Sequence, residues 1–136
     1  MAYIYVAGPL FTPGERLLLE QVDSLCKQAG HTTYLPHRDA GLFDRGTASS
    51  RAFFENDLDQ LKRCEGLVAV LNGLETDAGT CWELGYFYSL ERPILAYMED
   101  SRIFDPGRQI NPMLVNSIDH LAHSLGELKE LLTRLA

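Results

Sequence analysis

The chain has 136 residues, which fits one domain, and 46% of them are apolar, which is enough for a packed core. The formal net charge of −7, from 12 basic and 19 acidic residues, argues against a nucleic acid or an anionic membrane surface as a partner. No apolar run approaches the roughly 20 residues of a membrane-spanning helix, and the N-terminus lacks the basic region of a signal peptide. The 3 cysteines are far apart and form no CxxC pair, so we expect the protein to act in a reducing cytoplasm.

Strands and helices alternate in the predicted secondary structure. Apolar runs bounded by Gly and Pro predict strands at 3–7, 31–35, 66–71 and 93–98. Apolar residues at helical spacing predict helices at 15–29, from 49 or 50 to about 64, from about 78 to a point before 93, and after a capping box at 124–127. The segment 113–123 is compatible with a short helix and a short fifth strand around Ile118.

This order of elements predicts the fold class. Alternating strands and helices favour a mostly parallel sheet with helices on both faces. Five strands in a chain of this length predict a flavodoxin-like doubly wound α/β fold, with residues 1–136 forming a single domain. Two loops are expected, at 37–47 and 99–112, and the first is long and polar, as functional loops often are.

Two carboxylates, Asp77 and Glu83, follow the third predicted strand. They lie at a strand-to-helix junction, where open α/β proteins bind their ligands. The sequence neighbours of Glu83 are apolar and aromatic, which is not typical of a solvated helix face. Two interpretations of Glu83 remain open, a structural ion pair and a role in chemistry.

Other polar side chains are predicted to converge on the same crevice. The first strand brings Tyr5 to it, and the helix before the third strand carries Asp57, for which an exposed surface position is an equal alternative. An ionised Glu that Tyr5 orients in an apolar cleft suits attack on an anomeric carbon, because a carboxylate stabilises an oxocarbenium-like transition state and can capture it covalently. A second carboxyl group must then protonate the leaving group, and either Asp57 or Asp77 can do so if burial or charge repulsion raises its pKa.

The sequence lacks the motifs of several other ligand sites. It contains neither GxGxxG nor GxxxxGK[ST], so no dinucleotide or Walker-type phosphate loop is predicted. Its histidines have no metal-ligand spacing with cysteine, so no metal site is expected.

Taken together, these residues resemble the nucleoside 2-deoxyribosyltransferase family. The matching elements occur in the family's order and are spread over nearly the whole chain. They are Tyr5 with Ala7, Gly8 and Phe11; Asn56-Asp57-Leu58; Asp77-x-Gly79-x-x-x-Glu83-Leu84-Gly85-Tyr86; and Asn111-x-Met113.

The resemblance implies a transferase that moves 2-deoxyribose between nucleobases, without a metal or an organic cofactor. Glu83 looks like the nucleophile that attacks C1′ of a 2′-deoxynucleoside and forms a deoxyribosyl ester, and Tyr5 looks like the residue that orients it. Asp57 looks like the acid that protonates the departing base and later helps to deprotonate the incoming one. Asp77 looks like a ligand of the sugar 5′-hydroxyl.

The remaining matches imply substrate contacts and an assembly. Gly8 and Phe11 are similar to substrate-binding residues of the family. Asn111 and Met113 correspond to residues that reach into a neighbouring subunit's site, so the resemblance implies a homo-oligomer that binds 2′-deoxynucleosides and free nucleobases. Phe11, Met113 and Trp82 are expected to keep water from the ester, and the loop at 36–47 is expected to touch the base.

Two alternatives to this function are considered. A related branch hydrolyses nucleoside 5′-monophosphates with small hydroxyl residues around the phosphate; here Asp77 and Asn111 occupy the corresponding positions, and a carboxylate would repel a phosphate. The second is a non-catalytic, flavodoxin-like nucleotide-binding module. For a flavin site, Thr12 is the only nearby hydroxyl after the first strand, so this alternative is disfavoured.

Overall fold

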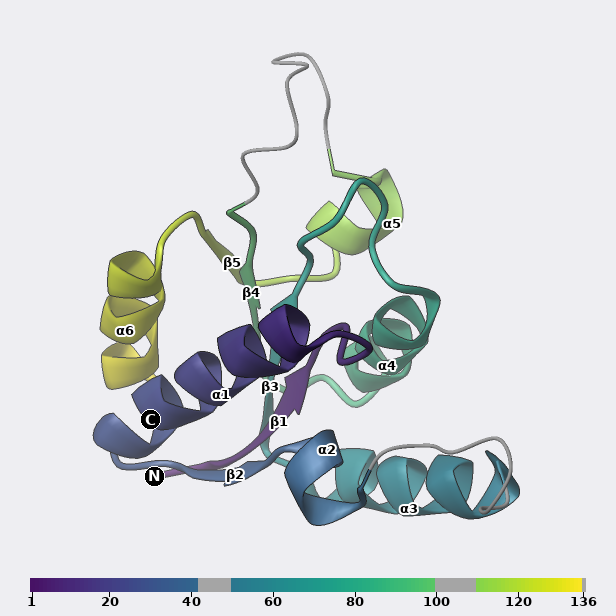
Figure 1. Ribbon diagram of the computed structural model, residues 1–136. Coiled ribbons are helices and arrows are strands. Elements are labelled where there is room, and N and C mark those ends of the chain that lie inside the picture. The colour runs from purple at the N-terminus through teal and green to yellow at the C-terminus, as the bar shows by residue number, and fades with distance from the viewer. Residues whose placement is uncertain (42–49, 100–109, 136) are drawn as a thin grey trace.

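A five-stranded sheet with helices on both faces forms the protein (Figure 1). The computed structural model describes residues 1–41, 50–99 and 110–135. The strands are β1 (Tyr3–Ala7), β2 (Thr32–Tyr34), β3 (Gly66–Val70), β4 (Ile94–Tyr97) and β5 (His120–Ala122). The helices are α1 (Pro13–Gln28), α2 (Pro36–Asp39), α3 (Ser50–Arg63), α4 (Ala78–Tyr88), α5 (Pro112–Val115) and α6 (Leu125–Arg134).

The strand order confirms the predicted fold class. The strands lie in the order β2-β1-β3-β4-β5, and every neighbouring pair among them is parallel. This is the flavodoxin-like doubly wound order, in which the direction of winding reverses between β1 and β3. The ligand crevice of such a sheet lies at the carboxyl ends of these two strands.

Side chains that alternate along each strand build a separate core on each face of the sheet. On β1, Ile4 and Val6 point toward α1 and α6, whereas Tyr5 and Ala7 point toward α3, α4 and α5. Figure 1 shows the same division, with α1 and α6 on one side of the sheet and the other long helices opposite. Tyr34 of β2 lies on the same face as Tyr5, so that face presents two buried hydroxyl groups to α3 and α4.

Several element boundaries differ from those predicted. α1 begins at Pro13 because Thr12 and Glu15 form a complete capping box, which the periodicity alone did not indicate. At α6, the hydroxyl of Ser124 accepts from the Glu127 N–H as expected, but the Glu127 carboxylate accepts from a backbone N–H one residue before the cap. The short helix expected within 113–123 is present as α5, which begins one residue earlier, and the fifth strand expected around Ile118 is present as β5, which begins two residues later at His120.

The predicted loop at 37–47 begins instead with the short helix α2. Proline at the first helical position presets its backbone, and Arg38 holds the helix in place. The Arg38 guanidinium donates to both oxygens of Asp23 on α1, at 3.1 and 3.2 Å, and also to Asp39. The remainder of that loop, residues 42–49, lies outside the described residues, as do residues 100–109 of the loop expected at 99–112.

Gly8 lets the end of β1 approach its neighbours closely. A Cβ atom at this position would lie 2.6 Å from Leu19 Cδ2 and 3.0 Å from Val70 Cβ, so any larger residue would push β1 away from α1 and β3. Gly8 also lines the cavity at the carboxyl end of the strand, so this close approach helps to set the shape of the cavity.

Among the described helices, none is long and apolar enough to cross a bilayer.

Candidate active site

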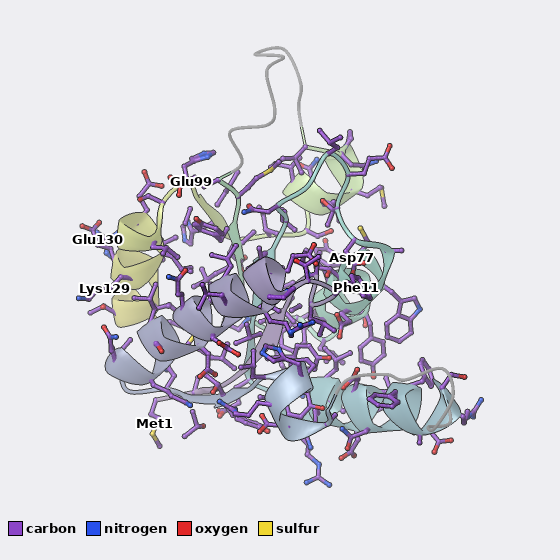
Figure 2. The ribbon with its side chains drawn as sticks, viewed as in Figure 1. Met1, Phe11, Asp77, Glu99, Lys129 and Glu130 are labelled. Atoms are coloured by element: carbon purple, nitrogen blue, oxygen red, sulfur yellow. The ribbon has the colours of Figure 1, made fainter. Side chains whose placement is uncertain are left out.

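A cavity of about 350 Å³ lies at the carboxyl ends of β1 and β3, where the topology predicts a ligand crevice. It brings together five of the residues predicted from sequence, which are Gly8, Phe11, Asp57, Asp77 and Glu83. The rest of its lining is Leu10, Pro36, Phe54, Leu58, Leu61, Gly79 and Trp82. Figure 2 shows Phe11 and Asp77 near each other, between the start of α1 and α4.

Glu83 lies on the second turn of α4 and accepts a hydrogen bond from the Tyr5 hydroxyl. Burial raises the pKa of Glu83 from its ordinary 4.5 to about 8; the bond from Tyr5 opposes this rise, and the charges of Asp57 and Asp77 add to it. The positive end of the α4 dipole favours the charged form of Glu83. Because the pKa is raised all the same, the effect of desolvation is larger than that of the dipole. No arginine pairs with Glu83 within the described residues, which removes the structural ion-pair interpretation for that part of the chain.

Tyr5 lies beneath the cavity, fully buried in the core. Burial, followed by the negative charges of Glu83 and Asp57, raises the pKa of Tyr5 far above its ordinary 10.0. The phenol therefore stays protonated and always has a hydrogen to donate. Its donation to Oε2 of Glu83 restricts that carboxylate to one orientation.

Asp57 is half-buried near the middle of α3 and lines the cavity, so the alternative of a fully exposed surface position is wrong. Its Oδ1 accepts from the Tyr34 hydroxyl at 2.9 Å, and the Tyr34 oxygen in turn accepts from Asn56 Nδ2 at 2.8 Å. Burial raises the pKa of Asp57, and the bond from Tyr34 lowers it. The cavity thus holds a second carboxyl group that retains its proton more readily than an exposed aspartate.

Asp77 is the N-cap of α4. Its Oδ2 accepts from both the backbone N–H and the hydroxyl of Thr80, each at 3.0 Å. This cap fixes the carboxylate at the edge of the cavity, and its Oδ1 takes no part in the cap. Asp77 can therefore support the helix that carries Glu83 and still present one oxygen to a ligand.

The apolar wall of the cavity includes an aromatic group that the sequence analysis only partly identified. Phe54 of α3 packs edge to face on Trp82 of α4 at 5.6 Å between ring centroids, and Trp82 stacks on Tyr86 at 5.5 Å. Phe11, from the segment after β1, also lines the cavity and is 71% exposed. Flat apolar side chains in the lining of a cavity suit a flat apolar ligand.

Asn111 and Met113 do not line this cavity. They lie in a separate groove between α4 and α5, about 1,220 Å³ in volume. Asn111 caps α5 through its own side chain, which accepts from the Met113 N–H at 2.8 Å, and Met113 is 77% exposed. Neither residue therefore completes the cavity of its own chain.

The described residues contain no group of three or more His, Cys, Asp or Glu side chains arranged to hold a metal ion. Those that line the cavity include no lysine, arginine or histidine either. Three carboxyl groups therefore face one small volume without a cationic side chain among the described lining residues. Burial raises the pKa values of two of them, Asp57 and Glu83, so these two hold a proton more readily than exposed carboxyl groups.

A sequence model of nucleoside 2-deoxyribosyltransferase matches residues 4–128 of the chain. The chain belongs to the nucleoside 2-deoxyribosyltransferase family. This membership agrees with the resemblance found in the sequence. The match covers β1 from its second residue, all of the other four strands and every residue that we considered for the site.

Two solved structures are similar over nearly their whole length. A conserved protein from Enterococcus faecalis V583 has a TM-score of 0.81 and 27% identity, and the match covers 100% of this chain and 99% of that one. The 2-deoxyribosyltransferase of the psychrotolerant bacterium Bacillus psychrosaccharolyticus has a TM-score of 0.78 and 25% identity, over 94% of this chain and 90% of that one. Both structures thus share the fold of this chain over nearly its whole length.

A curated relative comes from Schizosaccharomyces pombe. The uncharacterized protein C191.05c is 28% identical over 109 residues, which are 74% of this chain and 52% of that protein. The chain thus spans about half the length of this curated relative.

Proposed function

We propose that this protein transfers 2-deoxyribose between nucleobases through a covalent ester on Glu83. One arrangement carries this proposal. Glu83, oriented by Tyr5, lines a small apolar cavity together with Asp57, a second carboxyl group whose pKa is raised. A nucleophile and an acid on one cavity are the two groups that a retaining glycosyl transfer requires.

In the first half-reaction a Glu83 carboxylate oxygen attacks C1′ of a 2′-deoxynucleoside. The C1′–N bond breaks, and its electron pair goes to the base nitrogen, which takes a proton from Asp57. The free base leaves, and the sugar remains as an ester of Glu83. A 2′-deoxy sugar suits this route because it lacks the electron-withdrawing hydroxyl that would destabilise the oxocarbenium-like transition state.

In the second half-reaction another base enters and its nitrogen attacks C1′ of the ester. Asp57, now a carboxylate, takes the proton from the incoming base, and Glu83 departs as a carboxylate. The ester must survive between the two steps, so water has to be kept out. Trp82 and Phe11, which line the cavity and are partly exposed, are suited to this task.

The charge distribution supports these roles. Glu83 must be ionised to attack, and Asp57 must be protonated when the base departs. The charge of Asp57 raises the pKa of Glu83, and burial raises the pKa values of both groups, which favours states that hold one proton. The hydrogen bond from Tyr5 lowers the pKa of Glu83 and so increases the fraction of Glu83 that is ionised, although burial keeps the pKa above its ordinary value.

Asp77 is proposed to bind the 5′-hydroxyl of the sugar through the oxygen that the helix cap leaves over. The same carboxylate disfavours the alternative activity, hydrolysis of 2′-deoxynucleoside 5′-monophosphates. A phosphate at this position would lie beside a fixed negative charge, with no described cationic side chain in the cavity lining to compensate.

We further propose that the protein is a homo-oligomer in which Asn111 and Met113 complete a neighbour's cavity. Both are exposed and lie apart from the cavity of their own chain. The groove that holds them also includes exposed Leu74, Tyr88 and Val115, an amount of apolar surface that favours an interface over permanent contact with water.

The test is a panel of donors and acceptors with identification of every product. Purine and pyrimidine 2′-deoxynucleosides, ribonucleosides and 5′-monophosphates are each offered with a free base such as adenine. Formation of deoxyadenosine from deoxyinosine supports the proposal, and Glu83→Ala must abolish it. Release of 2-deoxyribose 5-phosphate without base exchange would establish the hydrolase instead.

A further inference from the structure

The Tyr34 hydroxyl has a buried position and two fixed partners. Tyr34 ends β2, is 3% exposed, and packs its ring on that of Tyr5, with 5.2 Å between the centroids. Its hydroxyl lies between α3 residues Asn56 and Asp57, at 2.8 and 2.9 Å. Tyr34 was not among the site residues predicted from sequence, because it lies on a different strand from them.

The direction of these two hydrogen bonds follows from the groups involved. The Asn56 Nδ2 amide can only donate, so the Tyr34 oxygen must accept from it. The single phenolic hydrogen is then left for Oδ1 of Asp57. Burial and the charge of Asp57 raise the pKa of Tyr34 well above its ordinary 10.0, so the phenol keeps this hydrogen throughout the working pH range.

One consequence concerns where the proton of Asp57 resides. Oδ1 is already an acceptor, and a proton placed there would face the phenolic hydrogen. The proton of a neutral Asp57 therefore resides on Oδ2. If Tyr34 lacked its hydroxyl, the proton would be distributed over both oxygens and the carboxyl group would be freer to rotate.

We propose that Tyr34 is a positioning residue that holds the proton of Asp57 on Oδ2 for delivery to the departing base. This inference rests on the proposed deoxyribosyl transfer. As the C1′–N bond breaks, its electron pair takes the Oδ2 proton, and Asp57 is left as a carboxylate. Tyr34 keeps its own proton and goes on donating to Oδ1, which stabilises the charge that has just formed.

The test is the variant Tyr34→Phe, which keeps the ring that packs on Tyr5 and removes only the hydroxyl. For base exchange from deoxyinosine we expect kcat to fall by about 10- to 100-fold with little change in KM, because the lost bond is one to a charge that forms in the transition state. The matched control is Tyr3→Phe. Tyr3 also extends from the sheet to α3, where it donates to Gln60 at 2.7 Å, and it does not line the cavity.

A second donor separates a positioning role from a structural one. The base of 7-methyl-2′-deoxyinosine carries a positive charge and leaves as a neutral molecule, so it needs no proton from Asp57. In a single turnover, Tyr34→Phe should release 7-methylhypoxanthine from this donor at a rate within about threefold of the wild type, which a misfolded or distorted site could not do. Equal losses with both donors, or no loss with either, would overturn the inference.

The pH profile provides a third measurement. Among the described residues, the titratable groups around Asp57 are Tyr5 on β1, Tyr34 on β2, Glu83 on α4 and, across the same cavity, Asp77 at the start of α4. Removing the Tyr34 donor should raise the pKa of Asp57, which moves the alkaline limb of kcat for deoxyinosine to higher pH. An unshifted limb contradicts the inference. If the wild type transfers sugar from neither donor, the proposed function fails first.

Discussion

Replacing Glu83 by glutamine should remove activity and make the fold more stable. The pKa of Glu83 is about 8 in the folded protein and 4.5 for the ordinary group, so folding favours the protonated side chain. Between these pH values the folded state holds a proton that the unfolded chain has released. The free energy of unfolding of the wild type therefore falls as pH rises from about 4.5 to about 8.

The size of the effect follows from that difference in pKa. Complete ionisation of Glu83 lowers the free energy of unfolding by about 5 kcal/mol, at about 1.4 kcal/mol for each unit by which the pKa is raised. Glutamine resembles the neutral acid in shape and can still accept a hydrogen bond from Tyr5, and it never ionises. Glu83→Gln should thus match the wild type near pH 4.5, exceed it by about 3 kcal/mol at pH 7, and exceed it by about 5 kcal/mol at pH 9.

Urea unfolding at these three pH values, at one protein concentration, measures the difference. Glu130→Gln is the matched control, because this substitution removes the same charge from an exposed residue on the outer side of α6, far from the cavity (Figure 2). The control should leave the pH dependence of stability as it is in the wild type. A Glu83→Gln protein that is no more stable than the wild type at pH 9 would refute the claim that this carboxylate is desolvated.

Three further predictions concern neighbouring parts of the structure. Tyr5→Phe removes the hydrogen bond that favours ionised Glu83, so the acid limb of the kcat/KM profile, expected near pH 8 in the wild type, should move to higher pH. The rate at pH 7 should fall by about 10-fold or more, and an unmoved limb would show that Tyr5 does not influence the ionisation of Glu83. Gly8→Ala places a Cβ 2.6 Å from a side chain of α1 and should lower the free energy of unfolding by about 1–3 kcal/mol, whereas Gly14→Ala, with no atom within 4 Å, should not; equal thermal shifts would contradict this. The inactive Glu83→Ala protein and the weakened Asn111→Ala protein should regain exchange activity when they are unfolded and refolded together, because some cavities then combine Glu83 of one subunit with Asn111 of its neighbour. If the activity of the refolded mixture is only the sum of the two separate activities, the cavities are not shared between subunits.

The sequence was sufficient to predict those features that depend on residues close together in the chain. Asp77 and Glu83 are six residues apart, and the apolar strand before them with the helix after them fixes their place in an α/β sheet. The alternation of strands and helices likewise predicted the confirmed sheet. The short helix α2 was not predicted, because polar residues dominate its segment and a single turn is stabilised by the distant Asp23 rather than by local periodicity.

Features that depend on register could not be predicted. Tyr34 faces Asp57 only because β2 pairs with β1 so that Tyr34 lies beside Tyr5, and because α3 turns that side toward the sheet. Secondary-structure propensities contain no information about the register of two strands or about which side of a helix faces the sheet. The same holds for Asp57, for which the sequence alone left an exposed surface position as an equal alternative. Its place in the site was assigned through the resemblance to a family.

The concentration of acidic groups in the cavity has a consequence for inhibitor design. A cavity lined by Asp57, Asp77 and Glu83 selects small molecules by the sign of their charge before it selects them by shape. A cyclic amine whose protonated nitrogen replaces the reacting carbon of the sugar gains attraction that its uncharged carbon counterpart lacks. That preference increases in alkaline buffer for as long as the amine stays protonated, so medicinal chemistry on this scaffold should begin with cations.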